Sequence, residues 1–181
     1  MGRGGKLLRV MDETEFWQIV DETREAADGD PEEHADALVD RLTALDDPEA
    51  VLDFARHFET RFHRANRWDV WAAADVMLGG ADEEAFDFFR CWLIAQGRDV
   101  FEGALADPDA LAGLVPSFDP DADGDAEDVG FAADEAYEQL TGLRLPELDL
   151  PERDEPEGER PDFDDEEAMA ARLPRLWARF A

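Results

Sequence analysis

Residues 68–95, WDVWAAADVMLGGADEEAFDFFRCWLIA, decide the fold class. Two apolar runs are separated by Gly79-Gly80, a pair that typically ends a helix. Asp82 follows with two glutamates and a second apolar run, which is the pattern of an N-cap with an acidic first turn. We therefore predict one helix that ends before Gly79 and another that begins just after Asp82.

The same start signal recurs along the chain. Asp12 with Glu15 forms a capping box, and Asp30, Asp47 and Asp107 are each followed by proline. These signals predict an all-α, bundle-like single domain that is more than half helical. Helices are expected near 13–27, 31–45, 48–66, 67–78, 83–105, 108–114, 127–141 and 165–179. The segments 48–66 and 67–78 are read as two helices or as one long bent helix, and only 143–150 has any strand character.

The helical core domain is expected to span residues 11–142. Residues 1–10 carry three glycines and no helical pattern, so we read them as a disordered extension. Residues 119–167 hold 21 acids and three arginines, and prolines recur every five residues from Pro146 to Pro161. Residues 143–163 are therefore read as an extended, acidic, proline-rich linker.

Residues 164–181 are predicted to form a C-terminal helix that docks on the core and is kinked or restarted at Pro174. Its large apolar side chains need cover, because exposed aromatic patches are uncommon on soluble monomers. Trp92 and Phe88 are expected to provide it, since they lie opposite the main core face of their own helix. The docking side chains would be Leu173, Leu176, Trp177 and Phe180. The alternative is a free tail that serves a partner or a second copy.

The net charge of −31 argues against nucleic acid and against anionic membranes as partners, because both attract cations. No apolar run approaches the roughly 18 residues that a membrane span needs, and none has the flanks of a signal peptide. We therefore expect a cytoplasmic protein. The single cysteine, Cys91, lies in an apolar run and is read as a buried thiol rather than a reactive one.

Spaced aromatic and polar motifs run through most of residues 11–142. They are Phe16-Trp17, Arg67-Trp68-Asp69, Trp71, Gly79-Gly80, Phe89-Arg90, Trp92-Leu93-Ile94, Gln96-Gly97-Arg98, Asp107-Pro108, Ala136-Tyr137-Glu138 and Thr141-Gly142. In these motifs, which are densest in residues 67–111, the chain resembles a bacterial family, domain-of-unknown-function family 4240. The resemblance implies no activity, because the family has no established biochemistry.

Two charged residues fall on apolar helix faces. On a helical wheel of residues 51–76 Asp69 lies in the middle of the apolar face, and on a wheel of residues 86–105 Arg90 does the same. An unpaired buried charge is costly, so we predict that Asp69 and Arg90 form a buried ion pair. A structural role that fixes helix register is favoured over a catalytic one.

A basic and aromatic stripe lies beside the apolar face of residues 51–76. Such a stripe can hold an anion, a phosphate or an acidic peptide, although it can equally bind the protein's own acidic linker or face solvent. Residues on a neighbouring helix can contribute to the same groove. The candidate groove residues are His57, Arg61, Arg64, Trp68 and Trp71, with Gln96 and Arg98 from the neighbouring helix.

The sequence contains no motif of a known catalytic or metal site, and we expect no metal and no cofactor. Asp119, Asp121 and Asp123 match only the first half of a calcium loop, since Gly130 stands where a bidentate glutamate is required. The preferred hypothesis is a non-enzymatic module that binds a protein or peptide in the basic, aromatic groove. The alternative is an enzyme or binding domain for a small anion, held by arginine, with His57 or Asp69 as acid or base.

Overall fold

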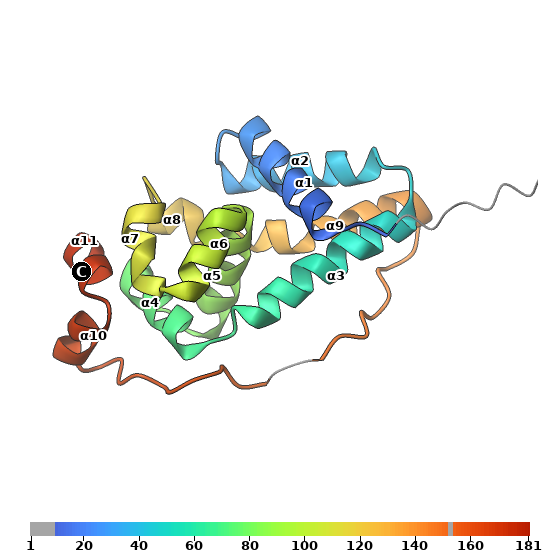
Figure 1. Cartoon of the computed structure of the whole chain (residues 1–181). Coiled ribbons are helices and arrows are strands. Elements are labelled where there is room, and N and C mark those ends of the chain that lie inside the picture. The colour runs from blue at the N-terminus through green and yellow to red at the C-terminus, as the bar shows by residue number, and fades with distance from the viewer. Residues whose placement is uncertain (1–9, 152–153) are drawn as a thin grey trace, which may run out of the picture.

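The computed structural model describes residues 10–151 and 154–181, and in these residues the chain is all-α with no strand (Figure 1). More than half of the chain is helical, as predicted. The helices are α1 (Glu13–Ala26), α2 (Pro31–Thr43), α3 (Pro48–Arg64), α4 (Trp68–Leu78), α5 (Glu83–Ala95), α6 (Arg98–Ala106), the 3₁₀ turn η1 (Pro108–Ala110), α7 (Leu111–Leu114), α8 (Pro120–Asp123), α9 (Glu127–Thr141), α10 (Glu166–Arg172) and α11 (Pro174–Phe180).

The predicted caps start these helices. The side chain of Asp12 accepts the backbone N–H of Glu15 at 2.8 Å, and Asp82 accepts that of Ala85 at 2.8 Å. The aspartates before α2 and α3 do the same, each with proline in the first turn. Each cap satisfies a backbone donor that the helix itself cannot pair.

One expected helix is divided, and the choice left open between one bent helix and two is decided in favour of two. Residues 83–105 form α5 and α6, because Gly97 adopts a φ of +99° and a Cβ there would lie 2.7 Å from Asp21 Oδ1. Residues 48–66 and 67–78 form two separate helices, α3 and α4, which are broken at Ala65–Arg67. The segment 143–150 is not a strand.

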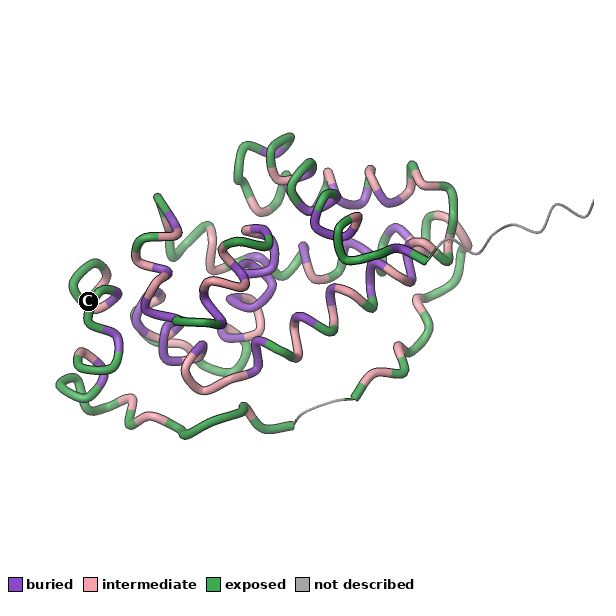
Figure 2. Tube along the Cα trace, in the orientation of Figure 1, coloured by how far each residue is buried: buried purple, intermediate pink, exposed green. Residues whose placement is uncertain are grey.

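The helices enclose one apolar core. Figure 1 shows α1, α2, α3 and α9 at one end of the molecule and α4 to α8 at the other, with α9 packed against α2, α3 and α5. In Figure 2 the buried positions face inward from every long helix. The largest fully buried side chains include Trp92, Phe16, Phe54, Phe89 and Phe101. No helix in the described residues is long and apolar enough to cross a bilayer.

After α9 the chain runs along the outside of the core to the opposite end, where α10 and α11 lie (Figures 1 and 2). The C-terminal segment is two short helices, because the chain breaks at Leu173 and a new helix begins at Pro174, the restart that the proline predicts. Residues 1–9, which make up most of the predicted extension, and residues 152–153 of the linker lie outside the described residues.

Helix α11 packs against α4, η1 and α7. Leu176 is fully buried, and the ring of Phe180 packs on Phe118, which in turn packs on Trp92. Helix α11 therefore contacts Trp92 through the ring of Phe118. The expected contact with Phe88 is wrong, because Phe88 lines a groove between α3, α5 and α9.

His34 makes the stability of the fold depend on pH. Its ring is buried against Thr23, with Nε2 2.9 Å from the hydroxyl, and that hydroxyl donates to the carbonyl of Ile19 at 2.7 Å. Neutral His34 therefore donates from Nε2. Burial lowers the pKa of His34 from 6.5 to about 4, so the unfolded chain binds a proton at a higher pH than the folded chain. The stability that neutral His34 contributes is present above pH 6.5 and is lost as the pH falls toward 4.

We predict that lowering the pH from 7 to 5 destabilises the wild type by about 2 kcal/mol more than it destabilises His34→Gln. Urea denaturation of both proteins at the two pH values measures this difference. The comparison cancels the effects of the many carboxylates, which both proteins share. Parallel pH dependences would show that His34 is protonated as readily in the folded chain as in the unfolded one.

Candidate functional site

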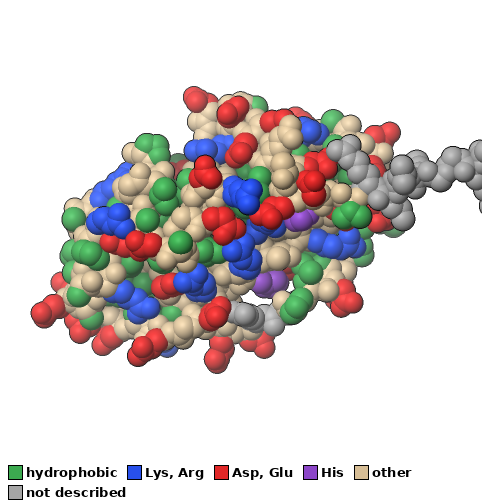
Figure 3. Space-filling view, in the orientation of Figure 1, with side chains coloured by type: hydrophobic (Ala, Val, Ile, Leu, Met, Phe, Trp, Pro, Cys, Tyr) green, Lys and Arg blue, Asp and Glu red, His purple; other side chains and the backbone are tan. Residues whose placement is uncertain are grey.

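The predicted basic stripe is divided between two places. Arg61 and Arg98 pair with Glu13 at the start of α1, and His57 lies beside Arg61. Arg64, Trp68 and Trp71 instead lie toward the linker. Figure 3 shows the basic side chains on this face interleaved with acidic ones, so that no continuous positive surface results. The reason is that carboxylates from α1 and α6 pair with the arginines of α3.

Arg61 joins α3 to α1 and is almost completely buried. It forms a 3.3 Å ion pair with Glu13, and its guanidinium lies 4.7 Å from the ring centroid of Phe16 and 5.1 Å from that of Trp17. Burial lowers the pKa of Arg61, and the charge of Glu13 opposes this effect. His57 Nε2 donates to the carbonyl of Met11 at 2.7 Å. Both side chains thus have structural partners within the core domain.

The two candidates from the neighbouring helix have partners of their own. Gln96, which follows α5, donates to the carbonyl of Trp92 at 3.2 Å. Arg98, at the start of α6, is exposed and lies 3.8 Å from the carboxylate of Glu13. Neither residue lines the cleft at Arg64, so the structure does not bring the seven candidates into one groove.

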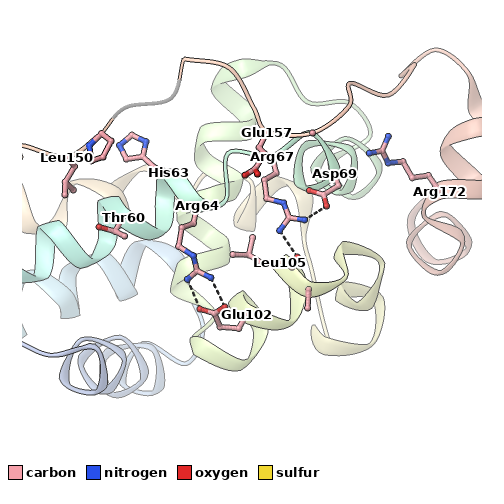
Figure 4. A pocket seen from close by; sticks show the side chains of 13 residues that line it. Thr60, His63, Arg64, Arg67, Asp69, Glu102, Leu105, Leu150, Glu157 and Arg172 are labelled. Carbon is pink, nitrogen blue, oxygen red and sulfur yellow. Dashed lines mark hydrogen bonds and ion pairs between the residues drawn. The ribbon is translucent and has the colours of Figure 1, made fainter.

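An open cleft of about 830 Å³ lies between α3, α6 and the linker (Figure 4). Arg64 crosses it to Glu102 with two hydrogen bonds of 2.8 and 3.0 Å. Arg67 pairs with Asp69 at 2.5 Å and donates to the carbonyl of Leu105 at 2.7 Å. The lining residues also include Thr60, His63, Leu150, Glu157, Gly158 and Arg172. The cleft is therefore walled by the core on one side and by the linker on the other.

The predicted ion pair between Asp69 and Arg90 is wrong. Asp69 pairs with Arg67 and is about one quarter exposed, whereas Arg90 is buried and pairs with Asp87. The wheel treated residues 51–76 as one helix, but the break after Arg64 gives α4 a new axis and turns Asp69 toward the cleft. Arg90 also donates to the carbonyl of Phe62 at 3.0 Å.

The aromatic part of the stripe forms a stack that the linker contacts. Trp68 and Trp71 stack with ring centroids 5.1 Å apart, and Trp71 stacks on Phe86 at 4.6 Å. From the linker, Phe163 lies 6.3 Å from both tryptophans, and the guanidinium of Arg160 lies 5.3 Å from the ring of Trp68. Trp71 Nε1 donates to the carbonyl of Ala81 at 2.8 Å, which fixes its ring.

The linker backbone also pairs with the break between α3 and α4. The N–H of Trp68 donates to the carbonyl of Glu157 at 2.9 Å, and the N–H of Glu157 donates to the carbonyl of Asn66 at 2.9 Å. These bonds form an isolated parallel bridge between Arg67 and Glu157. We call the surface made by Asn66, Arg67, Trp68 and Trp71 the junction groove, and the linker segment 154–163 occupies it.

The sequence pointed to Trp68 and Trp71 but missed Asn66, Glu157, Arg160 and Phe163. One signal was present, because Arg67 stands at the N-cap of α4 and its side chain caps no backbone N–H. The first turn of α4 therefore needs acceptors from elsewhere, and Glu157 provides one of them. Among the described residues, no group of three or more His, Cys, Asp or Glu is placed to hold a metal ion.

A family model described as a protein of unknown function (DUF4240) matches residues 11–139 of the chain. No curated protein and no solved structure matches the chain. The matched segment includes the junction groove on the core side and ends near the end of α9. The linker residues that fill the groove lie outside the match.

Proposed function

We propose that this chain, which belongs to the DUF4240 family of proteins of unknown function, is a non-enzymatic interaction module that binds an extended acidic peptide in its junction groove. In the free protein the chain's own linker occupies the groove. A partner peptide of similar character replaces the linker. Segment 154–163 thus occupies, within the same chain, the site that the partner peptide would bind.

The observation that carries the proposal is the backbone bridge at Glu157. Both of its hydrogen bonds, with the N–H of Trp68 and the carbonyl of Asn66, use main-chain atoms of the peptide segment. Such bonds accept any extended peptide that presents an N–H and a C=O on one edge. Backbone pairing of this kind provides affinity, while neighbouring pockets select side chains.

The aromatic stack gives the groove its side-chain preference. Trp68 presents a face that an arginine or an aromatic ring can cover, as Arg160 and Phe163 do in the linker. Stacked aromatic pairs contribute about 0.5–1.5 kcal/mol beyond their buried area. A preferred peptide therefore carries an aromatic residue a few positions after the bridging residue.

The segment that occupies the groove indicates an acidic peptide as its replacement. Segment 154–163 is rich in aspartate and glutamate, whereas Arg64 and Arg67 in the adjacent cleft are already paired with Glu102 and Asp69. Replacing one acidic segment by another changes the local charge little. The exchange therefore costs less than bringing a new acidic peptide to the rest of this surface.

The alternative function, binding or turnover of a small anion, has less support. The arginines that were candidates for holding the anion are engaged by carboxylates, Arg61 by Glu13 and Arg64 by Glu102. An anion in the cleft has to displace a carboxylate that is covalently part of the chain. His57, the candidate acid or base, donates to a backbone carbonyl instead.

A peptide-exchange experiment tests the proposal. The probe is a fluorescein-labelled peptide of residues 154–165, DEPEGERPDFDD. We expect the full-length double variant Glu157→Pro/Phe163→Ala to bind it at least about tenfold more tightly than the wild type, because the tethered linker competes at millimolar effective concentration. Adding Trp68→Ala to the double variant should abolish the binding, and fluorescence anisotropy measures all three proteins.

Two controls separate groove binding from general attraction. The first is a peptide with proline in place of Glu157, which keeps most of the composition but lacks the N–H that bonds to Asn66. The second is Leu148→Ala, a linker variant that leaves Glu157 and Phe163 unchanged and should bind like the wild type. Equal binding of both peptides, or no loss with Trp68→Ala, would contradict the proposal.

A further inference from the structure

A second groove lies between α3, α5 and α9, away from the junction groove, with a volume of about 570 Å³. Its floor is apolar, and Phe131 stands at its edge with 56% of its surface exposed. We call it the α9 groove. Its apolar lining includes Phe62, Phe88, Cys91, Gly130 and Phe131.

Close contact between α9 and α5 shapes the floor of this groove. A Cβ at Gly130 would lie 2.8 Å from Cys91 Sγ, so only glycine lets the two helices approach this closely. Arg90 lies over the ring of Phe62 at 3.8 Å, and it also pairs with Asp87. Burial raises the pKa of Cys91 to about 12, which makes the thiol part of an apolar floor rather than a nucleophile.

The rim of the α9 groove carries charge of one sign. Five carboxylates line it, and no lysine or arginine is among the described lining residues. Glu59 lies near His63 and Asp87 pairs with Arg90, but Glu84 and Glu127 form no ion pair with any described residue. In the cleft beside the junction groove, by contrast, acids and arginines alternate.

We propose that the α9 groove is the docking site for a cationic amphipathic helix of a second protein. One or two large apolar side chains of that helix enter the groove beside Phe88 and Phe131. Lysines or arginines on the flanks of the helix then face Glu84 and Glu127. An apolar stripe bordered by cations is complementary to an apolar floor bordered by acids.

Other occupants fit the groove less well. A second copy of the chain carries −31 and would bring acids against acids. The apolar C-terminal helix α11 is already packed on α4, η1 and α7. A basic partner instead gains from the charge of the whole molecule as well as from the groove.

The test uses the full chain and a fluorescein-labelled amphipathic helix of leucine and lysine, about 14 residues long. A peptide of the same composition with leucine and lysine scrambled is the control for simple charge attraction. We expect the amphipathic peptide to bind at least about tenfold more tightly than the scrambled one. Phe131→Ser should remove most of that difference, and it replaces an exposed side chain, so the fold is unaffected.

Matched variants locate the binding. Leu143→Ser changes another exposed apolar residue, with 65% of its surface exposed, and should leave affinity within about twofold. Glu84→Gln/Glu127→Gln should weaken binding several-fold and reduce its dependence on salt, whereas Glu166→Gln/Glu167→Gln on α10 should not.

Three results would overturn the proposal. They are equal affinity for the two peptides, equal loss with Leu143→Ser and Phe131→Ser, and a wild-type dimer in sedimentation that Phe131→Ser converts to a monomer. The last result would assign the groove to a second copy of the chain.

Discussion

Asp109→Ala should lower the free energy of unfolding by about 2–4 kcal/mol and release α11 from the core. Asp109 lies in η1, is buried, and accepts hydrogen bonds from the first free N–H groups of α11. The N–H of Arg175 lies 3.0 Å from its carboxylate, and the N–H of Leu176 lies 2.9 Å from it. One aspartate thus caps a helix that begins 65 residues later in the chain.

The size of this effect follows from the lack of any other cap at the start of α11. The helix has seven residues, and Leu173 at its N-cap position offers no side-chain acceptor. A helix this short is not stable alone in water. Without the carboxylate, the N–H of Leu176 is buried beside a fully buried side chain and has no acceptor, which costs about 1–3 kcal/mol by itself.

Arg175→Ala is the control for this prediction. Its side chain is more than half exposed and pairs with Asp109 at 3.2 Å and with Asp107 at 2.9 Å. Removing it deletes the ion pairs but keeps both backbone N–H groups, so the loss should stay below about 1 kcal/mol. Urea denaturation followed by tryptophan fluorescence measures both variants, since Trp177 lies in α11. Equal losses for the two variants would mean that the surface ion pair, not the cap, holds the helix.

The sequence predicted the helices well because their start signals are local. Asp12, Asp30 and Asp82 each cap a helix through a neighbouring backbone N–H, so a few letters are enough to find it. The cap that Asp109 provides could not be predicted in this way, because it is not local. The sequence places it in the first turn after Asp107-Pro108, and nothing nearby reveals that its carboxylate caps α11.

The candidate site was predicted less well, because its charges are paired across the fold. The sequence predicted Arg61 and Arg64 in one basic stripe, but their partners Glu13 and Glu102 come from two different helices, α1 and α6. A helical wheel shows only one element and therefore cannot show that such a face is neutralised. The wheel also failed where it crossed a helix break, as it did for Asp69.

One alternative reading was that the stripe binds the protein's own linker, and the aromatic part of the stripe does contact it. Phe163 and Arg160 contact Trp68, and Glu157 pairs with the backbone on either side of Arg67. The regular prolines indicated an extended linker but gave no register against the core. That register depends on one backbone bridge and on the contacts of Phe163 and Arg160 with the tryptophans, none of which has a sequence motif.

Arg90→Ala should be the most damaging substitution of a charged residue in α5, with an expected loss of about 3–4 kcal/mol. The guanidinium lies 3.8 Å from the ring centroid of Phe62 and 4.7 Å from that of Phe86. It also donates to the carbonyl of Phe62, which the shorter side chain would leave without this partner. Arg90→Met should cost less than Arg90→Ala, because methionine keeps the apolar stem that packs on the rings.

Burial lowers the pKa of Arg90, and the nearby Asp87 opposes that effect. The cost of burying this cation is therefore only partly offset by its carboxylate, and the aromatic rings and the carbonyl provide the remaining stabilisation. Asp69→Asn should by contrast cost less than about 1 kcal/mol, since Asp69 and Arg67 are both partly exposed.

A double-mutant cycle decides which partner Arg90 has. The structure predicts that Arg90→Met and Asp69→Asn are additive within about 0.5 kcal/mol, because the two side chains share no contact. Arg90→Met and Asp87→Asn should instead show a coupling energy of about 1 kcal/mol, reduced by the exposure of Asp87. Coupling in the Asp69 cycle and additivity in the Asp87 cycle would restore the pair that the helical wheel predicts and would require a different packing of α4 on α5.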